Sequence, residues 1–200
     1  LLALTVAGDE DVVEFSVNKI SDIMEGMGIK LFENDEIVNG WWASKHTLQW
    51  EKNKWPSGQR TAKFGAADVA VPPGRINDIY DAYLHYTEKY NIKKVGTAVY
   101  NSRPHISPSI SFAVYVDDHD KEQVKNFFRF VADMSKEALR MEGTMSSYIG
   151  DGIRLRRLTR LEHGKSLGLM WEIKKLIDPD LIMNPGKIFP KEYDPTDYEV

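Results

Sequence analysis

The chain has 200 residues, of which 42% are hydrophobic and 28% are charged, and its formal net charge is −4. This composition is typical of a globular protein with a sizeable core, and the acidic balance argues against a nucleic-acid partner, which normally requires a basic surface. The absence of cysteine from the chain excludes disulfides, zinc–thiolate sites, cysteine-ligated iron–sulfur clusters and a cysteine nucleophile here. No apolar run approaches the roughly 20 residues of a membrane-spanning helix.

Strands and helices are expected to alternate over the first half of the chain. Apolar spacing and turn residues predict a strand at 1–8, a helix at 9–26, a strand at 29–32, a helix at 41–50, a strand at 68–72 and a helix at 76–84. The acidic residues 9–11 suit the start of a helix, where the helix dipole favours negative charge. Because a natural N-terminus rarely begins inside a buried strand, we expect the chain to be a domain of a longer protein.

The second half is expected to complete a sheet and two long helices. The pattern predicts a strand at 94–100, a turn at 101–104, a strand at 110–116, a helix at 117–139 with Phe128 in its apolar stripe, and a glycine-containing segment at 143–152. The final helix is expected to bury its apolar face, which consists of Leu169, Met170, Ile173, Leu176 and Ile177. This order predicts an α+β fold, related to the ferredoxin-like arrangement, with helices on one face of a mostly antiparallel sheet.

The last quarter of the chain carries the most specific motif. The residue before a proline is pushed out of the helical region, so the final helix is expected to stop at Asp178-Pro179. The sequence Asn184-Pro185-Gly186-Lys187 then predicts a tight turn, because proline fixes one backbone angle and glycine permits an unusual one. This turn would present an asparagine and a lysine at a rigid position.

The string at 176–190 resembles the C-terminal signature of the FAD-linked oxidases that act on D-2-hydroxy acids, such as the glycolate oxidase flavin subunit and D-lactate dehydrogenase. The strand at 68–72 and the sequence Gly143-Thr144-Met145-Ser146 are similar to further segments of this family. The resemblance implies a cap domain over residues 1–190, an acidic tail at 191–200, and a separate FAD-binding domain of the same polypeptide. FAD would be bound mainly by that other domain, and Asn184 would face the cofactor.

Two departures from the family pattern concern its chemistry. The family's Glu-His pair after Gly-Thr-Val-Ser is replaced by Tyr148 and Ile149, and Glu162-His163-Gly164 lies too close to Asp178-Pro179 to take its place. Of the histidines that hold a metal in some relatives, His105 alone has a counterpart here. Because one imidazole cannot hold an ion that needs three or four protein ligands, no metal is predicted.

Four residues besides Asn184 are candidates for the site. His105 would act as the base that takes the hydroxyl proton, and Tyr148 stands where the resemblance places a catalytic carboxylate. Lys45 and Arg103 are candidate anchors for a substrate carboxylate, although Lys45 lacks the bidentate fork of the arginine found in relatives. From the residues alone, a backbone-bonded histidine, a packed tyrosine and solvated surface charges remain open interpretations.

A basic run follows the glycine-containing segment. It consists of Arg154, Arg156, Arg157 and Arg160, interleaved with leucines. Such spacing favours a charge-rich helix face over a surface for an anionic substrate or a partner subunit.

The resemblance implies that the chain is the cap domain of an FAD-dependent enzyme that oxidises glycolate or D-lactate to the 2-oxo acid. The implied partners are a small 2-hydroxy acid, the FAD-binding domain and an electron-transfer subunit, and the expected location is the cytoplasm or the inner face of a membrane. Two alternatives stay open: a flavoprotein similar to alkyldihydroxyacetone-phosphate synthase, and a non-catalytic binding or assembly domain. The isolated chain is expected to be inactive and to bind FAD weakly.

Overall fold

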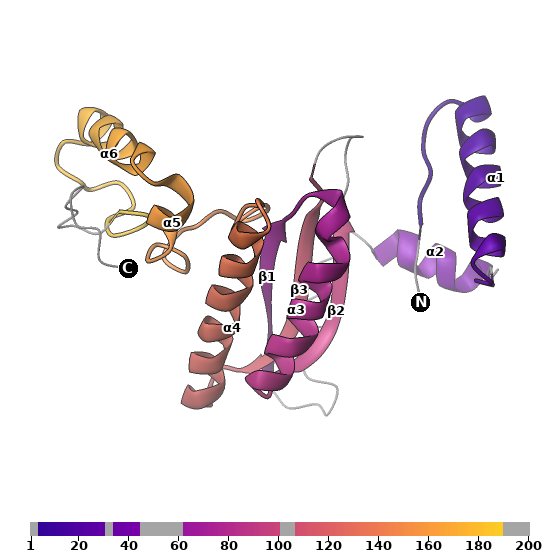
Figure 1. Ribbon diagram of the computed structural model, residues 1–200, viewed down its shortest axis with the longest axis horizontal. Coiled ribbons are helices and arrows are strands. Elements are labelled where there is room, and N and C mark those ends of the chain that lie inside the picture. Colours follow the sequence, from indigo (N-terminus) through magenta and orange to yellow (C-terminus); the bar gives the residue numbers. More distant parts are fainter. Residues whose placement is uncertain (1–3, 31–33, 45–61, 101–106, 190–200) are drawn as a thin grey trace. The chain divides into compact units, whose positions relative to one another are not determined.

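The computed structural model describes residues 4–30, 34–44, 62–100 and 107–189, and the chain forms two compact units, residues 1–49 and 50–200. The described part of the first unit carries two helices, α1 (Glu10–Gly26) and α2 (Asp35–Ser44) (Figure 1). The prediction of α1 is confirmed. Helix α2 begins before the predicted start at residue 41, and residues 45–50 lie outside the described part.

The two strands predicted for the first unit are wrong where the structure describes them. Residues 4–8 and 29–30 form no strand, and the remaining residues of the two predictions lie outside the described part. A strand is stable only with hydrogen-bonded neighbours, and the strands of the described sheet pair with one another. The sequence of a short apolar segment, such as 1–8 or 29–32, does not show whether a partner strand is available to it.

The second unit is built on a three-stranded antiparallel sheet. Its strands are β1 (Ala62–Ala70), β2 (Lys93–Tyr100) and β3 (Ser109–Asp117), and β3 lies between the other two. The short 3-10 helix η1 (Pro73–Arg75) and helix α3 (Ile76–Lys89) connect β1 to β2, which run parallel on either side of β3. This split β-α-β arrangement confirms the predicted α+β fold with helices and an antiparallel sheet.

Strand β1 begins well before its predicted start at residue 68. Its first half contains Gly65, Ala66 and Ala67, and small residues of this kind carry little β propensity. Gly65 is required by close packing, because a Cβ atom there would lie 2.6 Å from the ring of Phe127 on α4 (Lys121–Arg140). The missed half of the strand is therefore the part that lets α4 approach the sheet.

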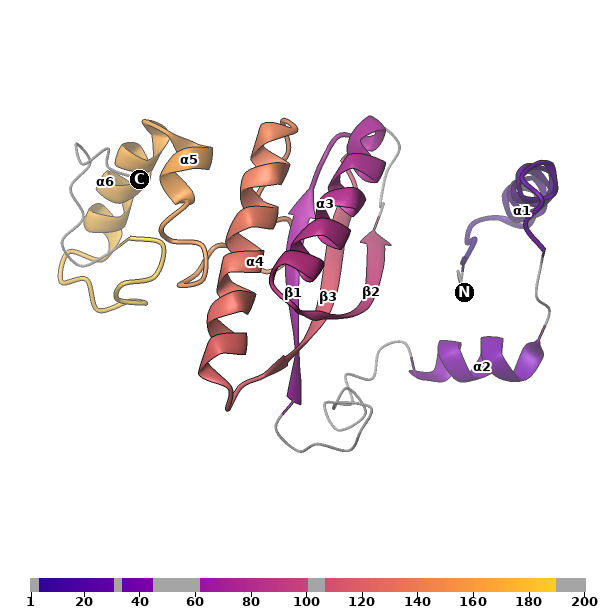
Figure 2. The same cartoon turned by 60° about the horizontal axis from the view of Figure 1, so that its bottom comes forward.

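Helices α3 and α4 pack on the same face of the sheet (Figures 1 and 2). The core lies between these helices and alternate residues of β3, and the predicted strand is confirmed. Its residues Ile110, Phe112, Val114 and Val116 are buried. Phe128, predicted to lie in the apolar stripe of α4, is 50% exposed. It follows Phe127, which packs against the core, and one residue corresponds to a rotation of about 100° around a helix.

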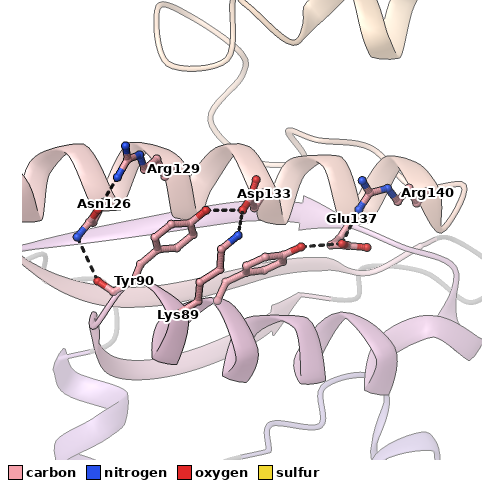
Figure 3. A network of polar contacts seen from close by, with 8 residues as sticks. Lys89, Tyr90, Asn126, Arg129, Asp133, Glu137 and Arg140 are labelled. Atoms are coloured by element: carbon pink, nitrogen blue, oxygen red, sulfur yellow. Dashed lines mark hydrogen bonds and ion pairs between the residues drawn. The ribbon is translucent and has the colours of Figure 1, made fainter.

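Polar side chains join α3 to α4 along the outer side of the helix pair (Figure 3). The hydroxyl of Tyr86 donates to Glu137 (2.7 Å), and Asp133 accepts hydrogen bonds from Tyr90 (2.5 Å) and Lys89 (3.0 Å). Burial alone would raise the pKa of Asp133, but the hydrogen bonds from Tyr90 and Lys89 outweigh it and lower the pKa below its ordinary value. The two helices are therefore held in register by polar contacts as well as by the core.

Tyr83 on α3 gives a test of this core. Its buried hydroxyl donates to the carbonyl of Ala113 (2.9 Å), and burial, with a smaller contribution from Tyr80, raises its pKa to about 12. Removing the hydroxyl in Tyr83→Phe is expected to lower the free energy of unfolding by about 1 kcal/mol, whereas Tyr80→Phe, at a half-exposed position, should change it by less than about 0.5 kcal/mol.

The pH dependence of this contribution has a fixed sign. The unfolded phenol titrates near its ordinary pKa of 10.0, below the folded value. The stabilising effect of protonated Tyr83 is therefore complete below about pH 10 and is lost as the pH rises towards 12. Chemical denaturation of wild type and Tyr83→Phe across this range should show the difference, and equal pH dependence in both would contradict the assignment.

The C-terminal part of the second unit contains α5 (Thr159–His163) and α6 (Ser166–Ile177). The end of α6 before Asp178-Pro179 confirms the predicted stop, but the predicted buried face is wrong. The helix buries Leu167 and Trp171, and the five residues predicted to be buried are exposed. Helix α6 is apolar on more than one side, so periodicity could not decide which side packs. None of the described helices is long and apolar enough to span a membrane.

Candidate functional site

The loop that follows α4 lies along the edge of β1 that β3 leaves free. In this site loop, defined as residues 143–158, the amide of Thr144 donates to the carbonyl of Ala70 (2.8 Å), and the amide of Ala70 donates back to Thr144 (3.1 Å). The amide of Ser147 donates to the carbonyl of Asp68 (3.3 Å). The structure thus joins two segments that the sequence analysis had singled out separately, the strand at 68–72 and the Gly-Thr-Met-Ser sequence.

The site loop then reaches over the sheet face opposite α3 and α4. The hydroxyls of Ser147 and Ser109 are 2.7 Å apart, and the ring of Tyr148 stacks on that of Tyr100, with centroids 5.5 Å apart and planes inclined by 7°. Ser109 is on this face because its neighbour Ile110 points into the core. Tyr148 is 67% exposed, so it combines a fixed ring orientation with access to solvent.

Small side chains line the same face of the sheet beside the loop. The strand register places Ala66 opposite Ala113 and Ser111 between Asp68 and Ala98. All of these except Asp68 are partly exposed. Small side chains leave room for a flat molecule to approach the sheet, and hydroxyl groups at its border can hydrogen-bond to that molecule.

Arg154 holds the returning part of the site loop on β1. Its Nη1 atom donates to the carbonyl of Ala66 (2.6 Å), and its Nη2 atom lies 3.7 Å from the carboxylate of Asp68. Both side chains are largely buried. Burial lowers the pKa of Arg154, while the negative charges of Asp68 and Asp151 oppose this shift. The buried guanidinium of Arg154 therefore has a structural role, which is to attach the site loop to β1.

The predicted charge-rich helix face at the arginine run is wrong. Residues 154–158 form turns, and α5 begins at Thr159. Arg157 is exposed, as expected, but Arg154 is not, because the turns direct it towards Asp68 instead of along a helix surface.

Two residues that the sequence analysis set aside contact the site loop. Glu162 accepts hydrogen bonds from the hydroxyl of Thr144 and from the amide of Met145, and Nε2 of His163 lies 3.4 Å from the carboxylate of Asp151. Spacing along the chain gave no indication of these contacts, because α5 folds back onto the start of the loop. Glu162 and His163 thus hold the site loop in place through their contacts with Thr144, Met145 and Asp151.

Asp178 organises the segment between α6 and the Asn184 turn. Its carboxylate accepts hydrogen bonds from the amides of Ile182 and Met183, both at 3.0 Å, and from the ammonium group of Lys174. Lys174 also donates to the carbonyl of Met183 (2.7 Å). The Asp-Pro pair therefore does more than end the helix, since the aspartate fixes the chain that leads into the turn.

The Asn184 turn meets the site loop. Asn184 and Gly186 adopt left-handed backbone conformations, with φ of 47° and 70°, and the turn borders a small hollow beside Trp171. Arg156 donates to the carbonyl of Gly186 (3.1 Å), and the amide of Ile188 donates to the carbonyl of Gly152 (3.0 Å). The C-terminal motif and the glycine-containing segment thus form one connected surface.

The structure describes two of the five candidate site residues. Tyr148 lies on the site loop and Asn184 lies in the adjoining turn, both exposed, while Lys45, Arg103 and His105 lie outside the described residues. Their roles remain predictions. Among the described residues, no three histidine, aspartate or glutamate side chains are grouped to hold a metal, and the prediction that the chain binds no metal also remains untested.

Asp178 is expected to determine the order of the Asn184 turn. In Asp178→Ala the amides of Ile182 and Met183 lose their acceptor, and their hydrogen exchange should accelerate roughly tenfold or more. The matched control is Asp180→Ala, at an exposed neighbouring position, which should leave exchange unchanged. Equal exchange in the two variants, measured by mass spectrometry, would show that the carboxylate does not hold the turn.

The contribution of Asp178 also depends on pH. The hydrogen bond from Lys174, against the opposing effect of burial, lowers the pKa of Asp178 from 3.8. The ionised carboxylate therefore stabilises the folded chain fully above about pH 4, and this stabilisation is lost as the pH falls through the lowered pKa.

A comparison with known protein families shows to which class of domain this fold, with its connected loop and turn, belongs. The family described as FAD linked oxidases, C-terminal domain, matches residues 1–188. The chain belongs to this family.

Individual relatives are dehydrogenases and an uncharacterised oxidoreductase. The chain is 32% identical over 159 residues to the mitochondrial D-lactate dehydrogenase [cytochrome] 1 of Saccharomyces cerevisiae, covering 78% of this chain and 26% of that protein. It is 33% identical over 192 residues to the probable mitochondrial D-lactate dehydrogenase of Danio rerio, covering 94% and 37%. A 57-residue stretch is 39% identical to the uncharacterised FAD-linked oxidoreductase YgcU of Escherichia coli, covering 28% and 12%. The chain spans between about a quarter and two fifths of the two dehydrogenases.

Proposed function

We propose that the chain is the substrate-side domain of an FAD-dependent dehydrogenase that oxidises D-lactate to the corresponding 2-oxo acid. The observation that carries the proposal is the site loop, which is folded over a sheet face of small residues and presents the exposed ring of Tyr148. The names of the relatives in yeast and fish favour D-lactate over glycolate within the D-2-hydroxy acids.

The described residues fit one side of a flavin site. The partly exposed small residues Ala66, Ser111 and Ala113 leave room beside the strands, and the Asn184 turn supplies a polar group at a fixed position beside the site loop. The sequence contains no glycine-rich loop that resembles the pyrophosphate-binding loop of the family's other domain. Most contacts to FAD would therefore come from another part of the polypeptide, with Asn184 as this chain's contact.

FAD, when bound, would supply the acceptor for the hydride that leaves the α-carbon of the substrate. In this proposal His105 and Tyr148 exchange the proton of the substrate hydroxyl, and Lys45 and Arg103 attract its carboxylate. Arg154 has a different role: it is a positioning residue, because its contacts with Ala66 and Asp68 are made within the chain.

Anaerobic flavin reduction in the full-length protein tests the proposal. D-lactate is expected to bleach the visible absorbance of the flavin, and L-lactate is expected to leave it unchanged. Tyr148→Phe should slow reduction by roughly 100-fold or more if the hydroxyl exchanges a proton. Tyr100→Phe is the matched control, because it alters the ring that stacks on Tyr148 while Tyr148 keeps its own hydroxyl.

Three outcomes would contradict the proposal. If D-lactate leaves the flavin oxidised and glycolate reduces it, the substrate assignment is wrong. If only a phosphate-bearing substrate reduces it, the chain belongs with the synthase-like flavoproteins. If the purified protein carries no flavin, and added FAD is reduced by none of these compounds in its presence, a binding or assembly function replaces the catalytic one.

FAD titration of the isolated chain tests separately how the contacts to FAD are divided between this chain and the rest of the polypeptide. Because the described residues offer one face only, the isolated chain is expected to bind FAD with a dissociation constant well above micromolar. Submicromolar binding, measured by quenching of flavin fluorescence, would show that this chain holds the cofactor largely by itself.

A further inference from the structure

The Tyr148 segment, defined as residues 148–153, is an exposed part of the site loop. Tyr148 and Ile149 are 67% and 61% exposed. Gly150 and Gly152 adopt left-handed backbone conformations, with φ of 74° and 52°, and a Cβ atom at either position would meet no atom within 4 Å. The packing of neighbouring side chains therefore does little to hold this segment.

Asp151 attaches the Tyr148 segment to the rest of the unit through its side chain. It lies between the two glycines, and its side chain is 13% exposed. Its carboxylate lies 3.4 Å from Nε2 of His163, and its negative charge also acts on the guanidinium of Arg154. Arg154 in turn donates to the carbonyl of Ala66 on β1. The contacts of Asp151 thus lead on one side to α5 and on the other side to the sheet.

The charges in this group balance when His163 is protonated. With a neutral imidazole, the two carboxylates of Asp151 and Asp68 share the guanidinium of Arg154, which leaves one negative charge uncompensated within the group. A charged imidazole supplies a second cation next to Asp151. An opposite charge at this distance favours the charged form of each partner, so protonation of His163 strengthens its contact with Asp151.

Other charged residues near His163 do not replace Asp151 in this role. Arg160, Glu162 and Lys165 flank the histidine in the sequence. Arg160 and Lys165 are cations, which disfavour a charged imidazole. The carboxylate of Glu162 is engaged by hydrogen bonds from the start of the site loop. Asp151 is therefore the contact through which the charge of the imidazole is felt.

The attachment of Asp151 bears directly on the orientation of Tyr148. The other end of the segment is fixed by the contact between the hydroxyls of Ser147 and Ser109, and the ring of Tyr148 stacks on that of Tyr100. Asp151 follows Tyr148 by three residues along the chain. A firm attachment of Asp151 therefore limits how far the exposed ring can move along its stacking partner.

We propose that His163 is a positioning residue of the candidate site, and that its protonation, acting through Asp151, fixes the Tyr148 segment. The proposal rests on the proposed function in one respect, that Tyr148 meets the substrate. The charge of a histidine side chain ordinarily changes between about pH 5 and 8. Because the folded chain favours the charged imidazole, the segment is held firmly at the acidic end of this range and loosens as the pH rises.

Hydrogen exchange in the full-length protein with bound FAD tests the attachment of the segment. The amides of Leu155 and Ile188 donate to the carbonyls of Asp151 and Gly152, both at 3.0 Å, so their exchange reports on the segment. Protection factors, which correct for the intrinsic effect of pH on exchange, are measured by mass spectrometry at about pH 5.5 and about pH 8. Protection at both amides is expected to fall about threefold at the higher pH.

Three variants identify the group that causes this change. In His163→Gln and in Asp151→Asn, protection of the two amides should be the same at both pH values, because the charged pair cannot form. The matched control is His119→Gln, which removes a histidine whose Nε2 lies 4.0 Å from Asp118 at an exposed position outside the site loop. This control should keep the pH dependence of the wild type.

Anaerobic flavin reduction by D-lactate separates positioning from chemistry. The half-saturating concentration of D-lactate is expected to rise about threefold between about pH 5.5 and about pH 8 in the wild type. It should stay constant in His163→Gln. The limiting rate of reduction should keep its own pH dependence in this variant, because the proposed base is His105.

Equal wild-type protection at the two pH values would overturn the proposal without any variant. A pH dependence that survives in His163→Gln would overturn it too, as would a change in protection with no change in the half-saturating concentration of D-lactate. If protection depends on His163 but D-lactate reduces no flavin, the attachment through Asp151 is supported and the proposed substrate is wrong. The two proposals can therefore fail separately.

Discussion

Replacing Arg154 with methionine is expected to lower the free energy of unfolding by about 3 kcal/mol. The substitution keeps most of the apolar stem but removes the guanidinium that donates to Ala66 and lies 3.7 Å from Asp68. Removing one partner of a buried ion pair leaves the other charge uncompensated in a poorly solvated place, which costs about 3–5 kcal/mol in full burial. Arg154 is slightly exposed, so we expect the lower end. Chemical denaturation of the purified protein measures the change.

The arginine run provides a matched control for this prediction. Arg157→Met makes the same chemical change at an exposed position and should alter the free energy of unfolding by less than about 0.5 kcal/mol. Adding Asp68→Asn to Arg154→Met should recover part of the loss, because the uncompensated charge is then removed as well. A double variant as unstable as Arg154→Met alone would mean that the hydrogen bond to Ala66 dominates.

Gly143→Ala is expected to cause a loss of similar size, about 3 kcal/mol. A Cβ atom at this position would lie 2.1 Å from the carbonyl oxygen of Ala70 and 2.8 Å from that of Ala138. Both oxygens accept backbone hydrogen bonds at the start of the site loop, from Thr144 and from Gly143. Because neither the strand nor the end of α4 can yield easily, the loop must shift, and these bonds must lengthen.

Two measurements make the glycine prediction specific. Gly74→Ala is the control, since a Cβ atom at Gly74 meets no atom within 4 Å. Hydrogen exchange should show faster exchange at Ala70 and Thr144 in Gly143→Ala and unchanged exchange in Gly74→Ala. Wild-type exchange rates in Gly143→Ala would mean that the Gly-Thr-Met-Ser sequence is not anchored by this close approach.

The sequence was sufficient to predict those helices and strands whose apolar residues recur on the face that packs against the core. The strand β3 and the helix α3 each bury one face, and both elements were predicted. The first half of β1 was missed because glycine and alanine give no strand signal, although the same small residues make room for α4. The buried face of α6 was predicted wrongly for the opposite reason, since apolar residues surround too much of the helix to select a side.

The site was only partly predictable, because its contacts join residues far apart in the chain. The motifs at 143–146 and 184–187 were recognised separately, but no spacing rule indicated that Ile188 would hydrogen-bond to Gly152. Arg154 looked like one of four surface arginines, and Glu162 and His163 looked unrelated to the loop they contact. Polar residues in turns reveal their partners only when the chain path is known.

The contacts of Arg156 with Gly186 and of Ile188 with Gly152 have a thermodynamic consequence. They join the turn proposed to meet the cofactor to the loop that carries Tyr148, so displacing either segment would strain these two hydrogen bonds. Under the proposed function, if these contacts couple flavin binding to substrate binding, each ligand changes the affinity for the other by the same factor. The affinity of the protein for flavin would then depend on bound substrate, and its affinity for substrate would depend on bound flavin.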